Sequence, residues 1–236
     1  AATSPVRGFV PSSFSDQLVP PNAGAIPIPL PQGPGFPELV DLSPLNEVAV
    51  FQEGRIKSWE SFSRSMMQYV SGSQEIDGQS PAFTYLDIAL RPDAYVDRDI
   101  IFVKKKPMRA AVVTALVEAG AQRPPTATDA RLAAFMENGL ISRELVLTPS
   151  VISLLDTMQG DVLRFAKPIE AIQTAVSVAR PEILRRSMAM VPPTGPDADK
   201  IPWKTLDDVT QEFIGSPLVS QWLELQRAWQ SEDAAA

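Results

Sequence analysis

The sequence predicts a mainly α-helical, irregular domain with one small strand pair, preceded by an extended, proline-rich N-terminal arm. Apolar residues recur at spacings of three and four along most of the chain after residue 44. Only two short runs, 48–51 and 100–103, are apolar and rich enough in Val, Ile and Phe to indicate strands. Residues 1–44 contain ten of the 23 prolines, which excludes regular helix there.

We expect residues 1–44 to form an extended arm and residues 45–236 to form a helical domain. The run Ile26-Pro27-Ile28-Pro29-Leu30-Pro31 favours polyproline II or extended backbone and excludes a central strand. The arm is too apolar for a freely solvated linker, so it is expected to lie along a surface, either of its own domain or of a partner. Its predicted partner contacts are Phe9, Phe14, Ile26, Ile28, Leu30 and Phe36.

Caps and breaks divide the rest of the chain into helices. Ser58 is the predicted N-cap of a helix that carries Trp59, Phe62, Met66 and Val70 on one face and ends at Gly72. A long helix is predicted over residues 149–166, followed by a new helix from Pro168. The other predicted helices begin at Pro81, Pro107, Arg131, Pro181, Leu206 and Pro217.

The composition restricts the chemistry that the chain can perform. It has no cysteine and no histidine, which excludes thiolate and histidine catalysis, disulfides, the usual zinc sites and histidine-ligated haem. The chain is therefore predicted to be non-catalytic and to need no cofactor or metal. The alternative is a hydrolase that uses two facing carboxylates.

Charge and hydropathy restrict its partners and its location. The net charge of −7 argues against nucleic-acid binding. The sequence has no run of about 20 apolar residues, so no transmembrane segment is expected. The chain begins with Ala1 and Ala2, as a mature protein does after signal-peptide cleavage, although a trimmed chain would begin in the same way. An extracytoplasmic location follows as an expectation.

Several conspicuous residues receive structural interpretations. Lys104-Lys105-Lys106 is expected to be a solvated turn, with an acidic partner or lipid headgroups as the alternative. Asp197 and Asp199 are assigned to a plain loop, and Asp207 with Asp208 to a helix start. The seven methionines are expected to fill the core. Trp222 and Trp229, seven residues apart, are also assigned to the core, with a docking face as the alternative.

One stretch resembles a known family. Gly54-Arg55-Ile56-Lys57 follows the short hydrophobic run Val48–Phe51 and is itself followed by Phe62 and Arg64. This pattern resembles the extracytoplasmic soluble region of System II cytochrome c biogenesis proteins, which export haem and ligate it to apocytochrome. Further similar features are Arg91-Pro92-Asp93-Ala94, Asp99–Val103, Met190–Pro193 and Ile201-Pro202-Trp203.

The sequence also departs from that family. Ser58–Ser61 stands where the family has Pro-Leu-Asp-Thr, and the family's histidine ligands, tryptophan-rich haem-handling segment and membrane helices are absent here. The resemblance therefore implies a fold and a location rather than haem chemistry. It implies a helical domain on the extracytoplasmic side, near membrane electron-transfer machinery. Arg55 and Lys57 are expected to tie the turn to neighbouring groups, with a partner contact as the alternative.

The resulting hypothesis is an accessory or scaffolding subunit. It would dock on the extracytoplasmic (periplasmic) face of a membrane respiratory or photosynthetic complex. A cytochrome is a candidate partner within that complex. A soluble cytochrome c assembly domain that handles haem or apocytochrome is the second hypothesis. The carboxylate hydrolase is the third.

Overall fold

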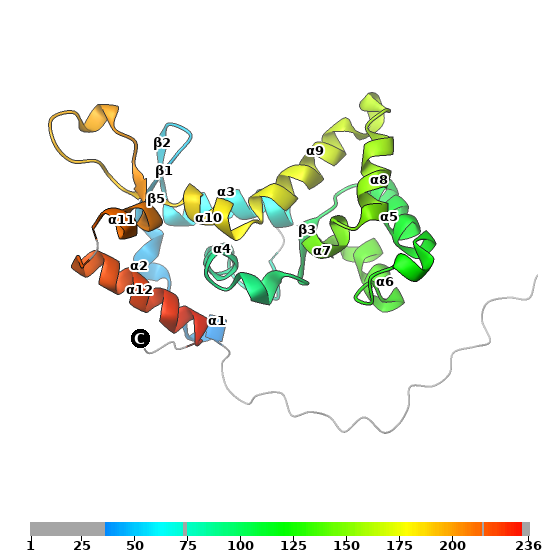
Figure 1. Cartoon of the computed structure of the whole chain (residues 1–236), viewed down its shortest axis with the longest axis horizontal. Coiled ribbons are helices and arrows are strands. Elements are labelled where there is room, and N and C mark those ends of the chain that lie inside the picture. Colours follow the sequence, from blue (N-terminus) through cyan, green and yellow to red (C-terminus); the bar gives the residue numbers. More distant parts are fainter. Residues whose placement is uncertain (1–35, 73–74, 214, 233–236) are drawn as a thin grey trace, which may run out of the picture. The chain divides into compact units, whose positions relative to one another are not determined.

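The computed structural model describes residues 36–72, 75–213 and 215–232, and it confirms the mainly α fold (Figure 1). The α-helices are α1 (Phe36–Leu39), α2 (Ser43–Asn46), α3 (Trp59–Ser71), α4 (Pro81–Leu90), α5 (Lys106–Glu118), α6 (Asp129–Asn138), α7 (Arg143–Val146), α8 (Pro149–Met158), α9 (Val162–Val178), α10 (Pro181–Ser187), α11 (Leu206–Glu212) and α12 (Pro217–Gln230). The strands are β1 (Ala49–Gln52), β2 (Arg55–Ser58), β3 (Asp99–Phe102), β4 (Leu140–Ser142), β5 (Ala189–Val191) and β6 (Lys204–Thr205). Three 3₁₀ turns, η1 (Pro92–Tyr95), η2 (Gly120–Gln122) and η3 (Ala198–Lys200), complete the described elements.

Both predicted strands are present, and each has its own partner. In the described part of the chain, the strands form three two-stranded antiparallel sheets: β1 with β2, β3 with β4, and β5 with β6. Glu53 and Gly54 connect β1 to β2, and both have positive φ angles, 52° and 77°. That is the two-residue turn whose twist matches an antiparallel hairpin.

The predicted ends of α3 are confirmed. The Ser58 side chain accepts a hydrogen bond from the Ser61 amide, and Gly72 closes the helix in the left-handed region. The predicted inward face is buried as well, because Trp59, Phe62 and Val70 have no exposed surface. Local capping chemistry therefore fixes both ends of the helix, and burial of one apolar face holds it in the core.

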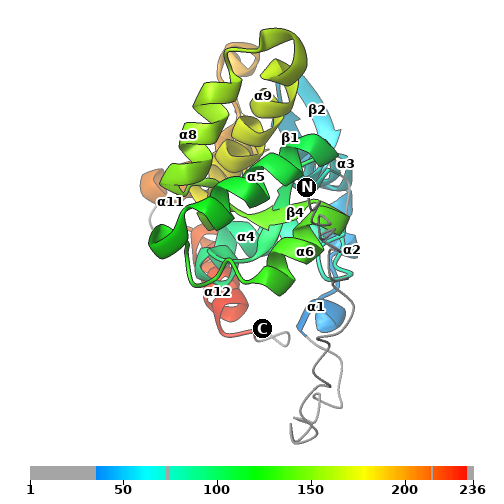
Figure 2. The same cartoon turned by 90° about the vertical axis from the view of Figure 1, so that its right-hand side faces the viewer.

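The predicted helix over residues 149–166 is wrong, and so is a new helix start at Pro168. Helix α8 ends at Met158, the chain turns through Gly160, and α9 then runs from Val162 to Val178 with Pro168 inside it. Figures 1 and 2 show α8 and α9 joined by this sharp turn. A proline inside a helix removes one backbone hydrogen bond. Packing of α9 against α3 and β3 keeps the two halves of the helix together.

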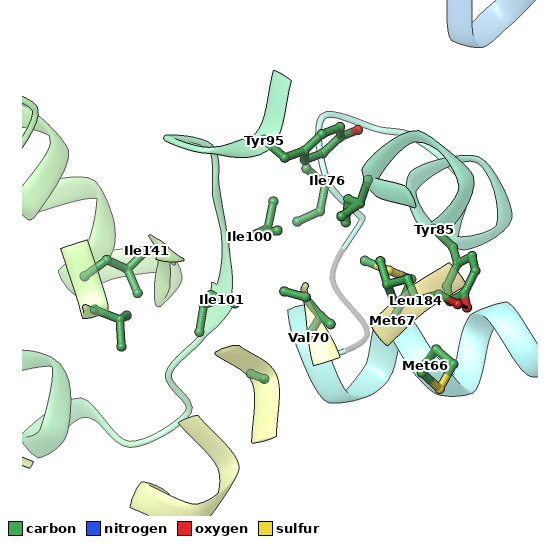
Figure 3. Packing of buried hydrophobic residues seen from close by; sticks show 14 of the residues in the cluster. Met66, Met67, Val70, Ile76, Tyr85, Tyr95, Ile100, Ile101, Ile141 and Leu184 are labelled. Carbon is green, nitrogen blue, oxygen red and sulfur yellow. Dashed lines mark hydrogen bonds between the residues drawn. The ribbon is translucent and has the colours of Figure 1, made fainter. Parts of the chain in front are cut away.

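The core is built around α3, which packs against α4, α9 and β3. Figure 3 shows Met66, Met67 and Val70 of α3 beside Tyr85 of α4, with Ile100 and Ile101 of β3 on the other side. Met66 and Met67 are 4% and 3% exposed, which confirms for them the predicted role in the core.

A buried polar cluster ties α12 to α4. Asp87, which has no exposed surface, accepts hydrogen bonds from four donors. Its Oδ1 accepts from Arg91 Nε at 2.6 Å and Trp229 Nε1 at 2.8 Å. Its Oδ2 accepts from Arg91 Nη2 at 2.9 Å and the Tyr95 hydroxyl at 2.7 Å. We call these four residues the Asp87 cluster. Trp229 is therefore a core residue, as predicted, and so is Trp222, at 6% exposure.

Two buried tyrosines make the stability of the protein sensitive to alkaline pH. Burial raises the pKa of the hydroxyl of Tyr85, which donates to the Leu184 carbonyl at 2.6 Å. Burial, together with the hydrogen bond to Asp87, also raises the pKa of Tyr95. Above the ordinary tyrosine pKa of about 10, these groups ionise in the unfolded chain but stay protonated in the folded one.

We therefore expect the free energy of unfolding to be unaffected by the tyrosines below about pH 10 and to fall above it. The slope is about 1.4 kcal/mol per pH unit for each buried tyrosine. Urea unfolding across this range should show a shallower decline for Tyr85→Phe than for the wild type. Tyr69→Phe is the control, because Tyr69 is 54% exposed. Parallel profiles for wild type and Tyr85→Phe would contradict the prediction.

Candidate functional site

The predicted partner-binding residues fall into two groups. Phe9, Phe14, Ile26, Ile28 and Leu30 lie outside the described residues. Phe36 begins α1 and is 8% exposed. Its ring lies 5.8 Å from that of Phe83 and 5.3 Å from that of Trp229, so Phe36 packs against the helical domain. The prediction that residues 1–44 contain no helix is therefore wrong for residues 36–39 and 43–44, which belong to α1 and α2. Pro37 and Pro44 stand in the first turns of these helices, where a proline removes no intrahelical hydrogen bond.

Arg55 and Lys57 lie on β2, in the β1–β2 hairpin. The Arg55 side chain is exposed to solvent. Lys57 is half-buried, and its Nζ donates to Gln52 Oε1 at 2.8 Å across the hairpin. Gln52 Nε2 in turn donates to the sulfur of Met66 at 3.1 Å. Lys57 is thus bonded within the hairpin, and Gln52 connects the hairpin to α3. A partner contact of Arg55 or Lys57 stays a prediction.

The predicted helix start at Asp207 and Asp208 is confirmed. Asp208 accepts from the Thr205 hydroxyl and amide, while the Thr205 hydroxyl accepts from the Asp208 amide. These hydrogen bonds lower the pKa of Asp208. Asp197 forms an ion pair with Lys200. Within the described residues, no three His, Cys, Asp or Glu side chains gather closely enough to hold a metal ion.

A hollow of about 650 Å³ lies among α1, α2 and the first turns of α3 and α4. Glu38, Asp41, Glu60 and Asp77 contribute carboxylates to its lining. A carboxylate hydrolase needs a general acid with a raised pKa. Hydrogen bonds from Ser43 instead lower the pKa of Asp41, and Glu60 is ion-paired with Arg64. The hydrogen bonds at Asp41 and the ion pair at Glu60 thus do not favour a general acid in this hollow.

A second hollow, of about 420 Å³, lies near the C-terminal end of the chain and has a different character. We call it the C-terminal groove. Its lining residues are Val191, Pro192, Pro193, Thr194, Ile201, Lys204, Val209, Phe213, Ser216 and Leu218.

Three structural elements build the C-terminal groove. The β5–β6 pair, in which Val191 is opposite Lys204, forms one side. Helix α11 forms the base and is held at its start by the capping box between Thr205 and Asp208. The other side is the first turn of α12, where the Ser216 side chain accepts from the Val219 amide. Strand pairing and helix capping thus fix part of the lining, and the loop residues Pro192, Pro193, Thr194 and Ile201 complete it.

Large apolar side chains are exposed in this groove. Phe213 is 54% exposed, and Ile201 and Leu218 are each 44% exposed. Lys204 adds a cation near the Phe213 ring, with its Nζ 5.9 Å from the ring centroid. Single exposed apolar residues are ordinary on protein surfaces, whereas apolar residues grouped in a groove mark an interaction site.

Sequence reasoning missed the C-terminal groove. Phe213 follows Val209 by four residues, and that spacing predicts a place on the same buried helix face. Helix α11 ends at Glu212, however, and Phe213 has φ −121° and ψ 48°. Because the helix ends before Phe213, the spacing no longer applies, and Phe213 is 54% exposed whereas Val209 is 4% exposed.

Neither a scan of protein-family models nor a search of curated proteins found a match to this chain. The resemblance to System II proteins stays a prediction.

Proposed function

We propose that this protein is a non-catalytic accessory subunit that docks on the extracytoplasmic face of a membrane electron-transfer complex. The observation that supports docking is the C-terminal groove, with Ile201, Phe213 and Leu218 exposed together. Its proposed occupant is an apolar segment of a partner subunit.

The lining of the groove favours a protein segment over a small polar ligand. Most of the lining side chains are aliphatic, aromatic or proline, and the polar ones are Thr194, Lys204 and Ser216. Protein interfaces have a desolvated apolar centre and a polar rim. Lys204, ion-paired with Glu212, belongs to such a rim. The prolines Pro192 and Pro193 give the loop a restricted backbone, which lowers the entropy lost on binding.

The membrane location rests on the sequence resemblance. None of the helices in the described residues is long and apolar enough to span a bilayer. In this proposal the membrane contact is made by the partner complex, and the accessory subunit is peripheral.

Replacing both exposed anchors, Phe213→Asp with Leu218→Asp, is expected to weaken binding to the partner complex at least about tenfold, since a single buried interface anchor commonly contributes 2 kcal/mol or more. The complex would first be isolated with the tagged wild-type chain from gently solubilised source membranes, and its subunits identified by mass spectrometry. The affinity of each variant for the isolated complex would then be measured by titration.

The matched control is Val96→Asp with Val117→Asp. These two side chains are 58% and 49% exposed but lie outside the groove. Equal loss of binding in both double variants would contradict the proposal, and so would no loss in either. Recovery with cytochrome maturation factors in place of respiratory or photosynthetic subunits would favour the assembly-domain hypothesis.

A further inference from the structure

A separate pocket of about 400 Å³ lies where the end of α3, the β3–α5 connection and the middle of α9 meet. We call it the lysine pocket. Its lining residues are Gln68, Tyr69, Gly72, Phe102, Val103, Lys104, Lys105, Lys167, Pro168, Ala171 and Ile172. It shares no residue with the C-terminal groove.

The lysine pocket concentrates positive charge in an acidic protein. Lys104 and Lys105 follow β3, and Lys167 comes from α9, so two distant segments contribute three lysines to the lining of one pocket. Among the residues that the structure describes, no carboxylate contributes to its lining. Three lysines around one pocket stand out in a chain whose net charge is −7. Like charges that share a hollow repel one another, and a bound anion removes that repulsion.

In the part of the chain that the structure describes, these three lysines form no ion pair, whereas about half of the other cations do. Arg91, Arg131 and Lys200 form ion pairs with aspartates of the same chain. Within the described residues, Lys104, Lys105 and Lys167 have no carboxylate within the 4.0 Å of an ion pair. Their charges are therefore available to a ligand.

The start of α5 reinforces the positive potential. Lys105 is the N-cap of this 13-residue helix, and its side chain makes no capping hydrogen bond. The first turn contains no acidic residue. The partial positive charge of the helix N-terminus is consequently not offset by a local carboxylate. This partial charge adds to the positive potential of the three lysines.

Apolar and aromatic residues complete the lining of the pocket. Phe102 is half-buried, and Tyr69 is exposed at the rim. Gly72 allows the Phe102 ring to lie against the end of α3, because a Cβ at Gly72 would stand only 2.1 Å from Phe102 Cδ1. Ile172 and Ala171 of α9 extend the apolar surface. The lining of the pocket thus combines cationic side chains with aromatic and aliphatic ones.

We propose that the lysine pocket binds a phosphate ester that carries an apolar or aromatic group. Lysine ammonium groups act as point charges that suit the tetrahedral oxygens of a phosphate, whereas planar carboxylates favour arginine. The apolar part of the ligand would lie against Phe102, Tyr69 and Ile172. A pocket of 400 Å³ has the size of a small-molecule site. The same chemistry is offered by a soluble phosphomonoester and by the headgroup region of an anionic phospholipid.

Phenyl phosphate is the probe for a soluble ligand, and phosphatidylcholine vesicles with and without phosphatidylglycerol are the probe for a lipid headgroup. The full chain is expected to bind one of them saturably, and phenyl phosphate more tightly than inorganic phosphate. Lys104→Gln with Lys167→Gln should weaken binding at least about tenfold, because each charge-assisted hydrogen bond contributes on that scale. Tyr69→Ala should reduce the preference for phenyl phosphate over inorganic phosphate.

The matched control is Lys200→Gln with Arg227→Gln, which removes the same charge at exposed positions outside the pocket. Saturable binding of phenyl phosphate would support a soluble phosphate ester, and binding only to phosphatidylglycerol vesicles would support a lipid headgroup. No saturable binding of either probe would overturn the proposal. Equal weakening in the control would also overturn it, since it would show that net charge alone is responsible. The variants all change exposed side chains, and circular dichroism would confirm that they fold.

Discussion

Asp87→Ala is expected to lower the free energy of unfolding by about 3–5 kcal/mol, the usual result of removing one partner of a buried, charged hydrogen-bond cluster. The carboxylate has no exposed surface, and all four donors around it would lose their acceptor. Arg91 would retain its ion pair with Glu232 and its position 5.2 Å from the centre of the Phe36 ring. The Trp229 indole and the Tyr95 hydroxyl would remain buried without Asp87.

Urea unfolding of the purified chain measures this effect. Asp87→Asn tests whether shape or charge matters, because the amide has nearly the same shape but turns an NH₂ group toward the donors. We expect it to retain little of the stability. The control is Glu60→Ala, which breaks an ion pair with Arg64 in which both side chains are more than half exposed. Such pairs contribute about 0–1 kcal/mol. A loss below about 1 kcal/mol for Asp87→Ala would show that the Asp87 cluster does not stabilise the fold.

Arg109→Met is expected to lower the free energy of unfolding by about 3 kcal/mol, because it leaves buried carbonyl groups without donors while retaining much of the side-chain volume. Arg109 is 6% exposed. Its Nε donates to the Val103 carbonyl at 2.7 Å, and its Nη1 donates to the carbonyls of Met136 and Glu137 at 3.1 and 2.8 Å. The guanidinium thus satisfies the last carbonyls of α6, which have no donor within the helix.

A double-mutant cycle with Gly139 makes this test specific. Gly139 ends α6 at φ +82°, and a Cβ there would lie 2.3 Å from Arg109 Nη2. Gly139→Ala therefore adds a clash to backbone strain, and the clash disappears when the guanidinium is removed. The combined loss of Arg109→Met and Gly139→Ala should be smaller than the sum of the single losses. Gly120→Ala is the control, because φ is +55° but an added Cβ meets nothing within 4 Å. Full additivity would contradict the proposed contact.

The location of most of the helices could be predicted because their signals are local. Ser58 and Thr205 each bond an amide only three residues ahead, and glycines at positions 72 and 139 end α3 and α6. A cap needs only a short stretch of chain, so it can be recognised in the sequence.

The strands β2, β4, β5 and β6 were not predicted. Each is four residues or shorter, and a strand of that length is stable only when it is paired. The partner of β4 lies some 40 residues earlier in the sequence, as the pairing of Phe102 with Leu140 shows. Pairing between distant segments leaves no periodic pattern in either of them.

By itself, the sequence determined the mainly helical class, most of the helix ends and the burial of Trp222 and Trp229, because these depend on propensity, capping and one apolar face. Only the tertiary structure decided which side chains meet. The Asp87–Trp229 hydrogen bond joins residues 142 positions apart, and Tyr85 reaches the Leu184 carbonyl across 99 positions. It also decided that Lys167 joins Lys104 at one pocket and that Phe213 is exposed at the end of α11. The lysine pocket arises from packing between distant segments, whereas the C-terminal groove arises from the way the chain folds back on itself within residues 191–218.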